Sequence, residues 1–186
     1  MKRTAFFCLA SQLFLLAVLP QTAASALPKD ETNLQRFVCN IGYTPEKCHK
    51  DMAVLRKTLA KYPLAQLGAW TWILVRSEDW KPTVMPRGLD PDSPAFTYYP
   101  KRETFIEEAL VANIPGRRDE LIARWHMSLD RLRDLTVAHE LGHAFCNDKS
   151  EEVANRCAEK LLEGKSPYFE TDLEAEIRAG NMRKTH

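Results

Sequence analysis

The segment from Leu129 to Phe145 constrains the chain most, because it must form one long helix that buries histidines together with apolar residues. Ser128 precedes the segment and can cap its first turn. Leu132, Thr136, His139, His143 and Cys146 follow the spacing of a single helix face. Other elements must therefore pack against a helix face that carries two imidazole rings.

Residues 139–143 read His-Glu-Leu-Gly-His, which is an H-E-x-x-H motif. Four residues make just over one helical turn, so both imidazoles project from the same face and can bind one Zn²⁺. Glu140 lies beside them, where it can take a proton from a zinc-bound water. Gly142 leaves room for a neighbouring strand or helix. The alternative is a pair of core or solvated histidines with no metal.

A catalytic zinc needs three protein ligands and one open position. Downstream of the motif, the carboxylates within reach are Asp148, Glu151 and Glu152. We favour Glu151, because it shares one face of the next helix with Asn155, whose amide can hold a metal-bound imidazole in position. Glu152 and then Asp148 are the alternatives, and an acidic helix start without a metal is a further interpretation of either glutamate.

The amino terminus has the three parts of a secretory signal peptide. A positively charged start and the apolar run Ala5–Leu19 precede the sequence Ala-Ser-Ala at 24–26. The run is shorter than the roughly 20 residues that a transmembrane helix needs. We expect residues 1–26 to be cleaved off, which leaves residues 27–186 as a periplasmic or secreted domain without a stable membrane anchor.

The cysteine count favours two disulfides. Cys8 lies within the expected signal peptide, so four cysteines remain in the exported chain. They allow three pairings. We favour Cys39–Cys48 and Cys146–Cys157, because each pair is close in sequence and flanks a predicted helix junction. Four buried free thiols are the alternative.

The composition is that of a globular domain, with 45% hydrophobic and 27% charged residues. It excludes a disordered tail, a collagen-like fibre and a multi-span membrane protein. The formal net charge of +1 gives no reason to expect a nucleic-acid partner, which calls for a basic excess.

Hydrophobic periodicity predicts an α+β fold. In residues 27–66 we expect a helical hairpin, made of a short helix over 30–37 and a second helix that starts at Pro45 with Thr44 as its cap. The aromatic and β-branched run Ala69–Val75 predicts a buried strand. Five prolines between 82 and 100 predict a stretch that is mostly loop.

The second half is expected to complete the core domain, residues 67–165. Phe96–Tyr99 and Thr104–Glu107 predict the two strands of a hairpin, although the second run could instead begin a helix that reaches Val111. A helix over 119–125 and a last long helix capped by Ser150 are expected to follow. Residues 166–186 are expected to form a C-terminal tail.

The motif and the helix after it resemble a known group of enzymes. The His-Glu-Leu-Gly-His sequence is followed by Glu151-x-x-Ala154-Asn155-x-x-Ala158-x-x-Leu161-Leu162. This pattern, over roughly residues 96–162, resembles the gluzincin-type zincin metallopeptidases, with the closest likeness to ImmA/IrrE-type domains. The resemblance implies a minimal zincin-like fold, in which a small twisted sheet packs on an active-site helix and a following ligand helix.

The resemblance also implies a function. We expect a zinc metallopeptidase that acts on a peptide or protein substrate, with Glu140 as general base. Zincins bind the substrate backbone along a sheet edge strand, for which Thr104–Glu107 is the candidate here. Tyr168, His126 and Tyr99 are candidates for stabilising the oxyanion. The alternative is a non-catalytic exported binding protein that zinc and two disulfides hold together.

Overall fold

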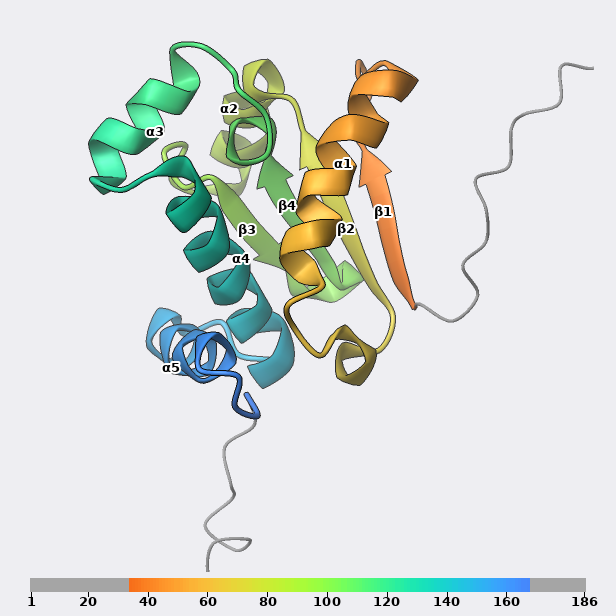
Figure 1. Ribbon diagram of the computed structural model, residues 1–186, viewed down its shortest axis with the longest axis vertical. Helices are drawn as coiled ribbons and strands as arrows, with labels where there is room; N and C mark the ends of the chain where they lie inside the picture. Colours follow the sequence, from red (N-terminus) through yellow and green to blue (C-terminus); the bar gives the residue numbers. More distant parts are fainter. Residues whose placement is uncertain (1–33, 168–186) are drawn as a thin grey trace, which may run out of the picture. The chain divides into compact units, whose positions relative to one another are not determined.

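The computed structural model describes residues 34–167 (Figure 1). This part of the chain is α+β, with a mixed four-stranded sheet and five α-helices, as the periodicity predicts. None of these helices combines the length and the apolar character that crossing a membrane requires. The expected signal peptide, residues 1–26, and nearly all of the expected tail lie outside the described residues.

The sheet has the strand order β1-β2-β4-β3. Its first three strands in this order are parallel, and β3 runs antiparallel to β4. The strand bounds are β1, Gln35–Cys39; β2, Trp70–Val75; β3, Ala95–Tyr98; and β4, Glu103–Glu107. The expected strand at Ala69–Val75 and the expected hairpin are therefore confirmed.

Two sequence expectations about the strands are wrong. Thr104–Glu107 belongs to β4, which is an inner strand, and the edge strand of the hairpin is β3. Of the helix expected over 30–37, the described part from Gln35 onward is strand β1 instead, so residues 34–66, the described part of the expected helical hairpin, contain a strand followed by a helix. The strand was missed because Gln35 is polar, although its side chain is buried. This side chain accepts from Trp72 Nε1 at 2.9 Å and donates to the Gly68 carbonyl at 2.6 Å.

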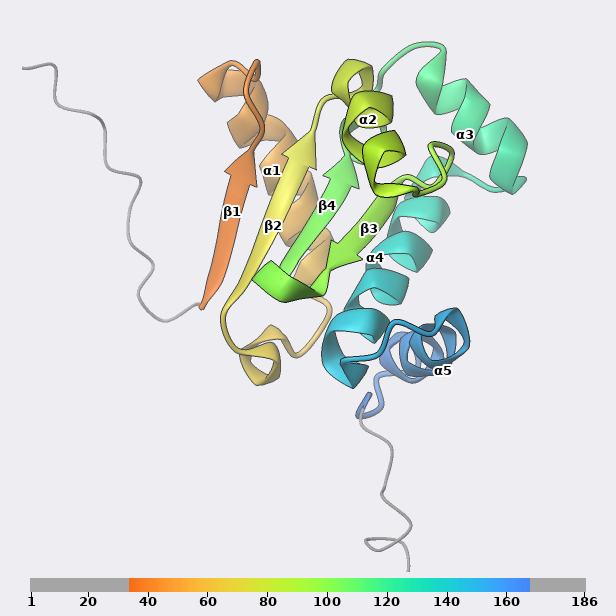
Figure 2. The same cartoon turned by 180° about the vertical axis from the view of Figure 1, so that it is seen from behind.

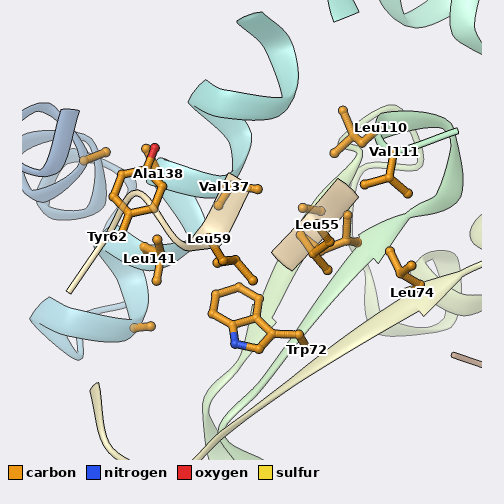
Figure 3. Packing of buried hydrophobic residues seen from close by; sticks show 14 of the residues in the cluster. Leu55, Leu59, Tyr62, Trp72, Leu74, Leu110, Val111, Val137, Ala138 and Leu141 are labelled. Carbon is orange, nitrogen blue, oxygen red and sulfur yellow. The ribbon is translucent and has the colours of Figure 1, made fainter. Parts of the chain in front are cut away.

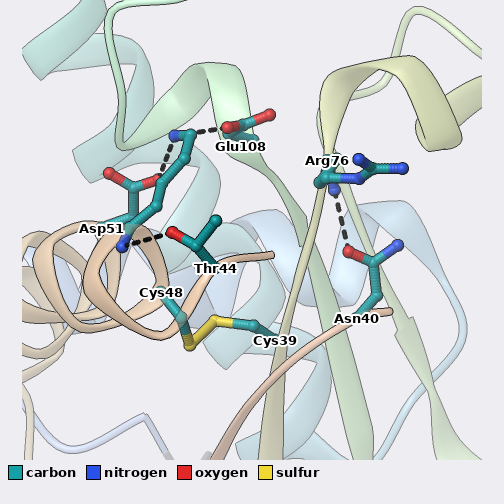
Figure 4. The surroundings of a disulfide bond; sticks show 8 residues. Cys39, Asn40, Thr44, Cys48, Asp51, Arg76 and Glu108 are labelled. Atoms are coloured by element: carbon teal, nitrogen blue, oxygen red, sulfur yellow. Dashed lines mark hydrogen bonds and ion pairs between the residues drawn. A yellow bond between two sulfur atoms is a disulfide. The ribbon is translucent and has the colours of Figure 1, made fainter. Parts of the chain in front are cut away.

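The first helix, α1, spans Pro45–Leu59 and begins as predicted. The Thr44 hydroxyl caps it by accepting from the Lys47 backbone N–H. A disulfide between Cys39 and Cys48 joins the end of β1 to this first turn (Figure 4), with the two Cα atoms 6.0 Å apart. Lys47 Nζ also reaches the buried carboxylate of Glu108, which ties α1 to the end of β4.

Helices cover both faces of the sheet (Figures 1 and 2). Helices α1 and α4 lie on one face, and α2 lies on the other. The bounds of the remaining helices are α2, Ser77–Val84; α3, Arg117–Trp125; α4, Leu129–Cys146; and α5, Glu151–Leu162. Helix α2 extends three residues into the stretch from Pro82 that was expected to be mostly loop, because Pro82 is accommodated near its C-terminal end.

The strands alternate between two cores. On the α1 and α4 face, Trp72 and Leu74 pack among Leu55, Leu59 and Leu141 (Figure 3). On the opposite face, Trp80 of α2 packs against Phe96, which stacks on Phe105 with ring centroids 4.6 Å apart. Burial on both faces fixes the register of the inner strands. A slip of one residue would move the side chains of each core to the opposite face of the sheet.

Candidate metal centre

The site forms where α4, α5 and the edge strand β3 meet. Helix α4 carries the H-E-x-x-H motif, and α5 follows it after a turn of four residues. Both helices begin as predicted, because the Ser128 and Ser150 hydroxyls accept from backbone N–H groups in the first turns. Asn147 ends α4 in the left-handed conformation (φ 48°), which lets the chain reverse at once.

The two helices cross at Gly142 with almost no space between their backbones. A Cβ atom at this position would collide with the carbonyl oxygen of Ala154 on α5. The motif glycine therefore permits the close approach that the sequence predicts, and the neighbouring element is α5. A disulfide between Cys146 and Cys157 joins the same helices, with a Cα separation of 6.6 Å.

Three ligand atoms converge on one point. One atom each from His139, His143 and Glu151 lies within 4.8 Å of the others. One carboxylate oxygen of Glu151 lies 3.0 Å from His139 Nε2, and the other lies 3.5 Å from His143 Nε2. Donors bound tetrahedrally to one ion at about 2 Å lie about 3.3 Å apart, and the two Glu151 distances are close to this value.

The alternative carboxylates are engaged elsewhere. Glu152 pairs with Arg156 one turn along α5, at 2.5 Å. The Asp148 carboxylate accepts from the Ser150 backbone N–H, in the turn before α5. Of the three acidic residues that the sequence offers, only Glu151 belongs to the converging group in the described part of the chain.

The far nitrogen of each imidazole is held by an oxygen acceptor. His139 Nδ1 lies 2.9 Å from Asn155 Oδ1, and His143 Nδ1 lies 2.8 Å from the Asp148 carbonyl oxygen. Because these oxygens only accept, both Nδ1 atoms carry the proton and both Nε2 lone pairs remain for a metal. Burial lowers the pKa of His143, which also favours the neutral ring that a metal requires.

This donor set fits a zinc ion. Two neutral imidazoles and one carboxylate form the N₂O set of many catalytic zinc sites, and the tautomers are already fixed. Asn155 makes the contact with an imidazole that its spacing predicts. Asp148 also positions an imidazole, but through its backbone carbonyl, which no sequence pattern indicates.

Glu140 is buried, with only 4% of its surface exposed. Burial raises its pKa to about 7, against the opposing effect of a hydrogen bond from Thr97 Oγ1 to its Oε2 at 2.7 Å. Thr97 lies on β3, and sequence reasoning missed it. The only available signal was the expected strand at Phe96–Tyr99, which does not identify the helix it faces.

A chain of donors leads from the sheet core to Glu140. Trp70 Nε1 donates to Thr104 Oγ1 at 3.0 Å, and Thr104 Oγ1 lies 3.1 Å from Thr97 Oγ1. A carboxylate can only accept, so Thr97 donates to ionised Glu140 and must accept from Thr104. The direction of every hydrogen bond is thereby set, and a neutral relay orients the carboxylate.

The three oxyanion candidates have different outcomes. The Tyr99 hydroxyl donates to the Asp148 carbonyl, and its ring lies edge-on to His143 with centroids 6.1 Å apart. Burial raises the pKa of Tyr99, so this hydroxyl stays protonated. His126 ends α3 in the left-handed conformation (φ 52°) and is not among the residues that line the cavities next to His139. Tyr168 lies outside the described residues.

No family model, curated protein or solved structure matches this chain. The two disulfides suit an extracellular or otherwise oxidising compartment.

Proposed function

We propose that this chain is an exported, zinc-dependent metallopeptidase that hydrolyses peptide bonds. One observation carries the proposal: three ligand atoms with preset imidazole tautomers converge beside a buried glutamate. His139, His143 and Glu151 would hold the ion. When bound, zinc supplies a Lewis acid that polarises a carbonyl oxygen and lowers the pKa of water.

Glu140 acts as general base and then as general acid. It accepts a proton from the attacking water and later donates that proton to the leaving amine. Burial raises the pKa of Glu140, which favours the protonated carboxyl group that the second step needs. Thr97 holds one carboxylate oxygen, so the other is left to face the reacting water.

The edge strand β3 gives the substrate backbone a place to bind. A cavity of about 580 Å³ is lined by residues 95–100 together with His139, Glu140 and His143. Strand β3 has a partner on only one side, so its other edge can pair with an extended peptide. The sequence assigned the binding of the substrate backbone to Thr104–Glu107, and we propose β3 for it instead.

The proposal is tested by metal analysis and peptide cleavage on the same purified samples. Wild type is expected to bind one zinc per chain and to cleave members of a mixed peptide library. Glu140→Gln keeps the shape of the side chain but cannot accept the proton. It should retain zinc and lose activity by about 10²- to 10⁴-fold.

Glu152→Gln is the matched control, because it makes the same chemical change on an exposed side chain outside the ligand set. It should bind zinc and cleave like wild type. Equal activity of Glu140→Gln and wild type would contradict the mechanism. Stoichiometric zinc without cleavage of any peptide would instead favour a non-catalytic zinc-stabilised binding protein.

A further inference from the structure

The cavity beside β3 differs in charge between its two ends. Strand β3 ends at Tyr98, and beyond it Tyr99 and Lys149 line the cavity. Lys149 is the only lysine or arginine among the described lining residues. At the opposite end, before β3 begins, the lining residue Asp90 pairs with Arg124 at 3.3 Å. A cation therefore lies at the end of the cavity where β3 finishes.

The turn that carries Lys149 is fixed to the metal centre. The carbonyl oxygen of Asp148 accepts from the Tyr99 hydroxyl and lies 2.8 Å from His143 Nδ1. The Asp148 carboxylate accepts from the Ser150 backbone N–H at 2.8 Å, and Ser150 caps α5. Because the residues on both sides of Lys149 are held, its backbone has a set position relative to the ligands.

The Lys149 ammonium group has no hydrogen bond or ion pair within residues 34–167. The nearby carboxylates have other partners, since Asp148 accepts from Ser150 and Glu151 lies against the two imidazoles. A divalent ion held by Glu151 beside Glu140 would offset both carboxylate charges. Lys149 would then leave this end of the cavity with a positive charge that an anionic group can neutralise.

A smaller cavity of about 250 Å³ meets this end at Tyr99, which lines both cavities, and it brings a second cation. Arg102 lines the smaller cavity, where its Nε donates to the Ala69 carbonyl at 2.8 Å and its Nη2 to the Leu67 carbonyl at 2.6 Å. Its guanidinium lies 5.2 Å from the centroid of the Trp70 ring. These contacts keep a second positive charge near Tyr99.

We infer that the Tyr99 end of the cavity beside β3 binds a carboxylate group of the substrate, and that Lys149 recognises it. The inference rests on the proposed peptidase function and names the class of substrate. Thr97 faces Glu140, and Tyr99 follows two residues later. A strand advances about 3.3 Å per residue, so this carboxylate belongs about two or three residues from the scissile bond.

The test is a peptide library in which aspartate and glutamate are compared with asparagine and glutamine at every position. Each peptide is made with a free and with an amidated C-terminus, and mass spectrometry locates the cuts. With zinc-loaded wild type, the acidic residue should be preferred over its amide by about 5- to 20-fold at one fixed position. If the carboxylate is instead that of the C-terminus, amidation should abolish the same preference.

Binding gives a readout that does not depend on cleavage. Zinc-loaded Glu140→Gln should bind the preferred acidic peptide more tightly than its amide counterpart by a similar factor. Raising the salt concentration from about 0.05 M to about 0.5 M should shrink this difference, because ions screen the charges of an exposed pair. An equal Kd for the two peptides at low salt would contradict the inference.

Two variants at one position assign the preference to Lys149. Lys149→Met keeps the length of the side chain without its charge and should remove the preference, while cleavage of neutral peptides stays within about twofold. Lys149→Glu should favour lysine or arginine at the same position. Lys50→Glu is the matched control, because Lys50 is an exposed residue of α1 that lines neither cavity, and it should behave like wild type.

The outcomes distinguish this inference from the proposed function. Cleavage by wild type with no preference for a carboxylate at any position would overturn the carboxylate site and leave the peptidase function standing. A preference that folded, zinc-loaded Lys149→Met retains in full would likewise overturn it. Failure of wild type to cleave any peptide would overturn the proposed function and this substrate site with it.

Discussion

Glu140 depends on residues from distant parts of the sequence. Its position beside the two histidines comes from α4, but its orientation comes from Thr97 on β3, which Thr104 and Trp70 support in turn. A hydrogen bond to an ionised group contributes about 1.5–3 kcal/mol. This is enough to hold a carboxylate in one rotamer within a buried site.

Removing the Thr97 hydroxyl should slow the reaction without removing the metal. Thr97→Val keeps the branched shape but cannot donate, so kcat should fall by about 10-fold or more while KM and zinc content change little. Thr97→Ser restores the donor and should recover most of the rate. Steady-state kinetics on one library-derived peptide makes the comparison. A Val variant as active as wild type would show that the hydrogen bond does not orient Glu140.

Glu151 and its neighbour Glu152 provide a matched pair for the third ligand. Glu151→Gln replaces a charged donor in the converging group and should weaken zinc binding by at least about 100-fold, as measured by competition with a chelating dye. Glu152→Gln should stay within about twofold of wild type, since Glu152 contacts Arg156. The opposite order would assign the ligand to Glu152.

At the scale of elements, the site depends on how closely α4 and α5 cross. Gly142 of α4 has no side chain, so its backbone can lie directly against the Ala154 carbonyl oxygen of α5. It brings Glu151 and Asn155, at the start of α5, within reach of the histidines.

Gly142→Ala tests this crossing. On an exposed helix the change would stabilise by about 1 kcal/mol, because alanine is the better helix former. Here the methyl group meets backbone, so we expect the free energy of unfolding to fall by about 1–3 kcal/mol and zinc affinity to fall with it. Arg131→Ala on the exposed first turn of α4 should change the free energy of unfolding by less than about 0.5 kcal/mol. Urea titration measures both.

Local chemistry made some elements predictable from the sequence. Helices α1, α4 and α5 each have a Ser or Thr cap followed by an apolar stripe, and the ligand set lies within residues 139–155. Strand β1 was missed because Gln35 is a polar residue whose burial only its partners on other elements explain. The inner place of β4 and the role of Thr97 depend on strand order, which periodicity does not reveal.

At the scale of the whole molecule, the candidate metal site is supported by a hydrophobic core that is built without the three ligand residues. Helix α4 packs through Val137, Ala138 and Leu141 into the cluster shared with the sheet and α1. The Arg117 guanidinium also pairs with the fully buried Glu107 at 2.8 Å, which holds α3 to the end of β4.

Removing zinc should therefore lower stability without unfolding the protein. With free zinc at 100 times its Kd, binding stabilises the folded state by about 2.7 kcal/mol, and a chelator removes that increment. We expect a lower Tm in the chelator, while the far-UV circular dichroism at 25 °C is unchanged. Loss of helical signal at 25 °C would show that the metal is needed for the fold itself.

The two disulfides each join cysteines that are consecutive in the described chain, 9 and 11 residues apart. Either of the other two pairings would close two loops of roughly 100 residues, and longer loops cost more entropy to close. The native pairing is thus also the pairing with the shortest loops, which forms first when the cysteines are oxidised in chain order. Oxidative refolding should therefore reach the two native disulfides with little reshuffling. The Cys146–Cys157 bond should then hold α4 against α5 before any metal is bound.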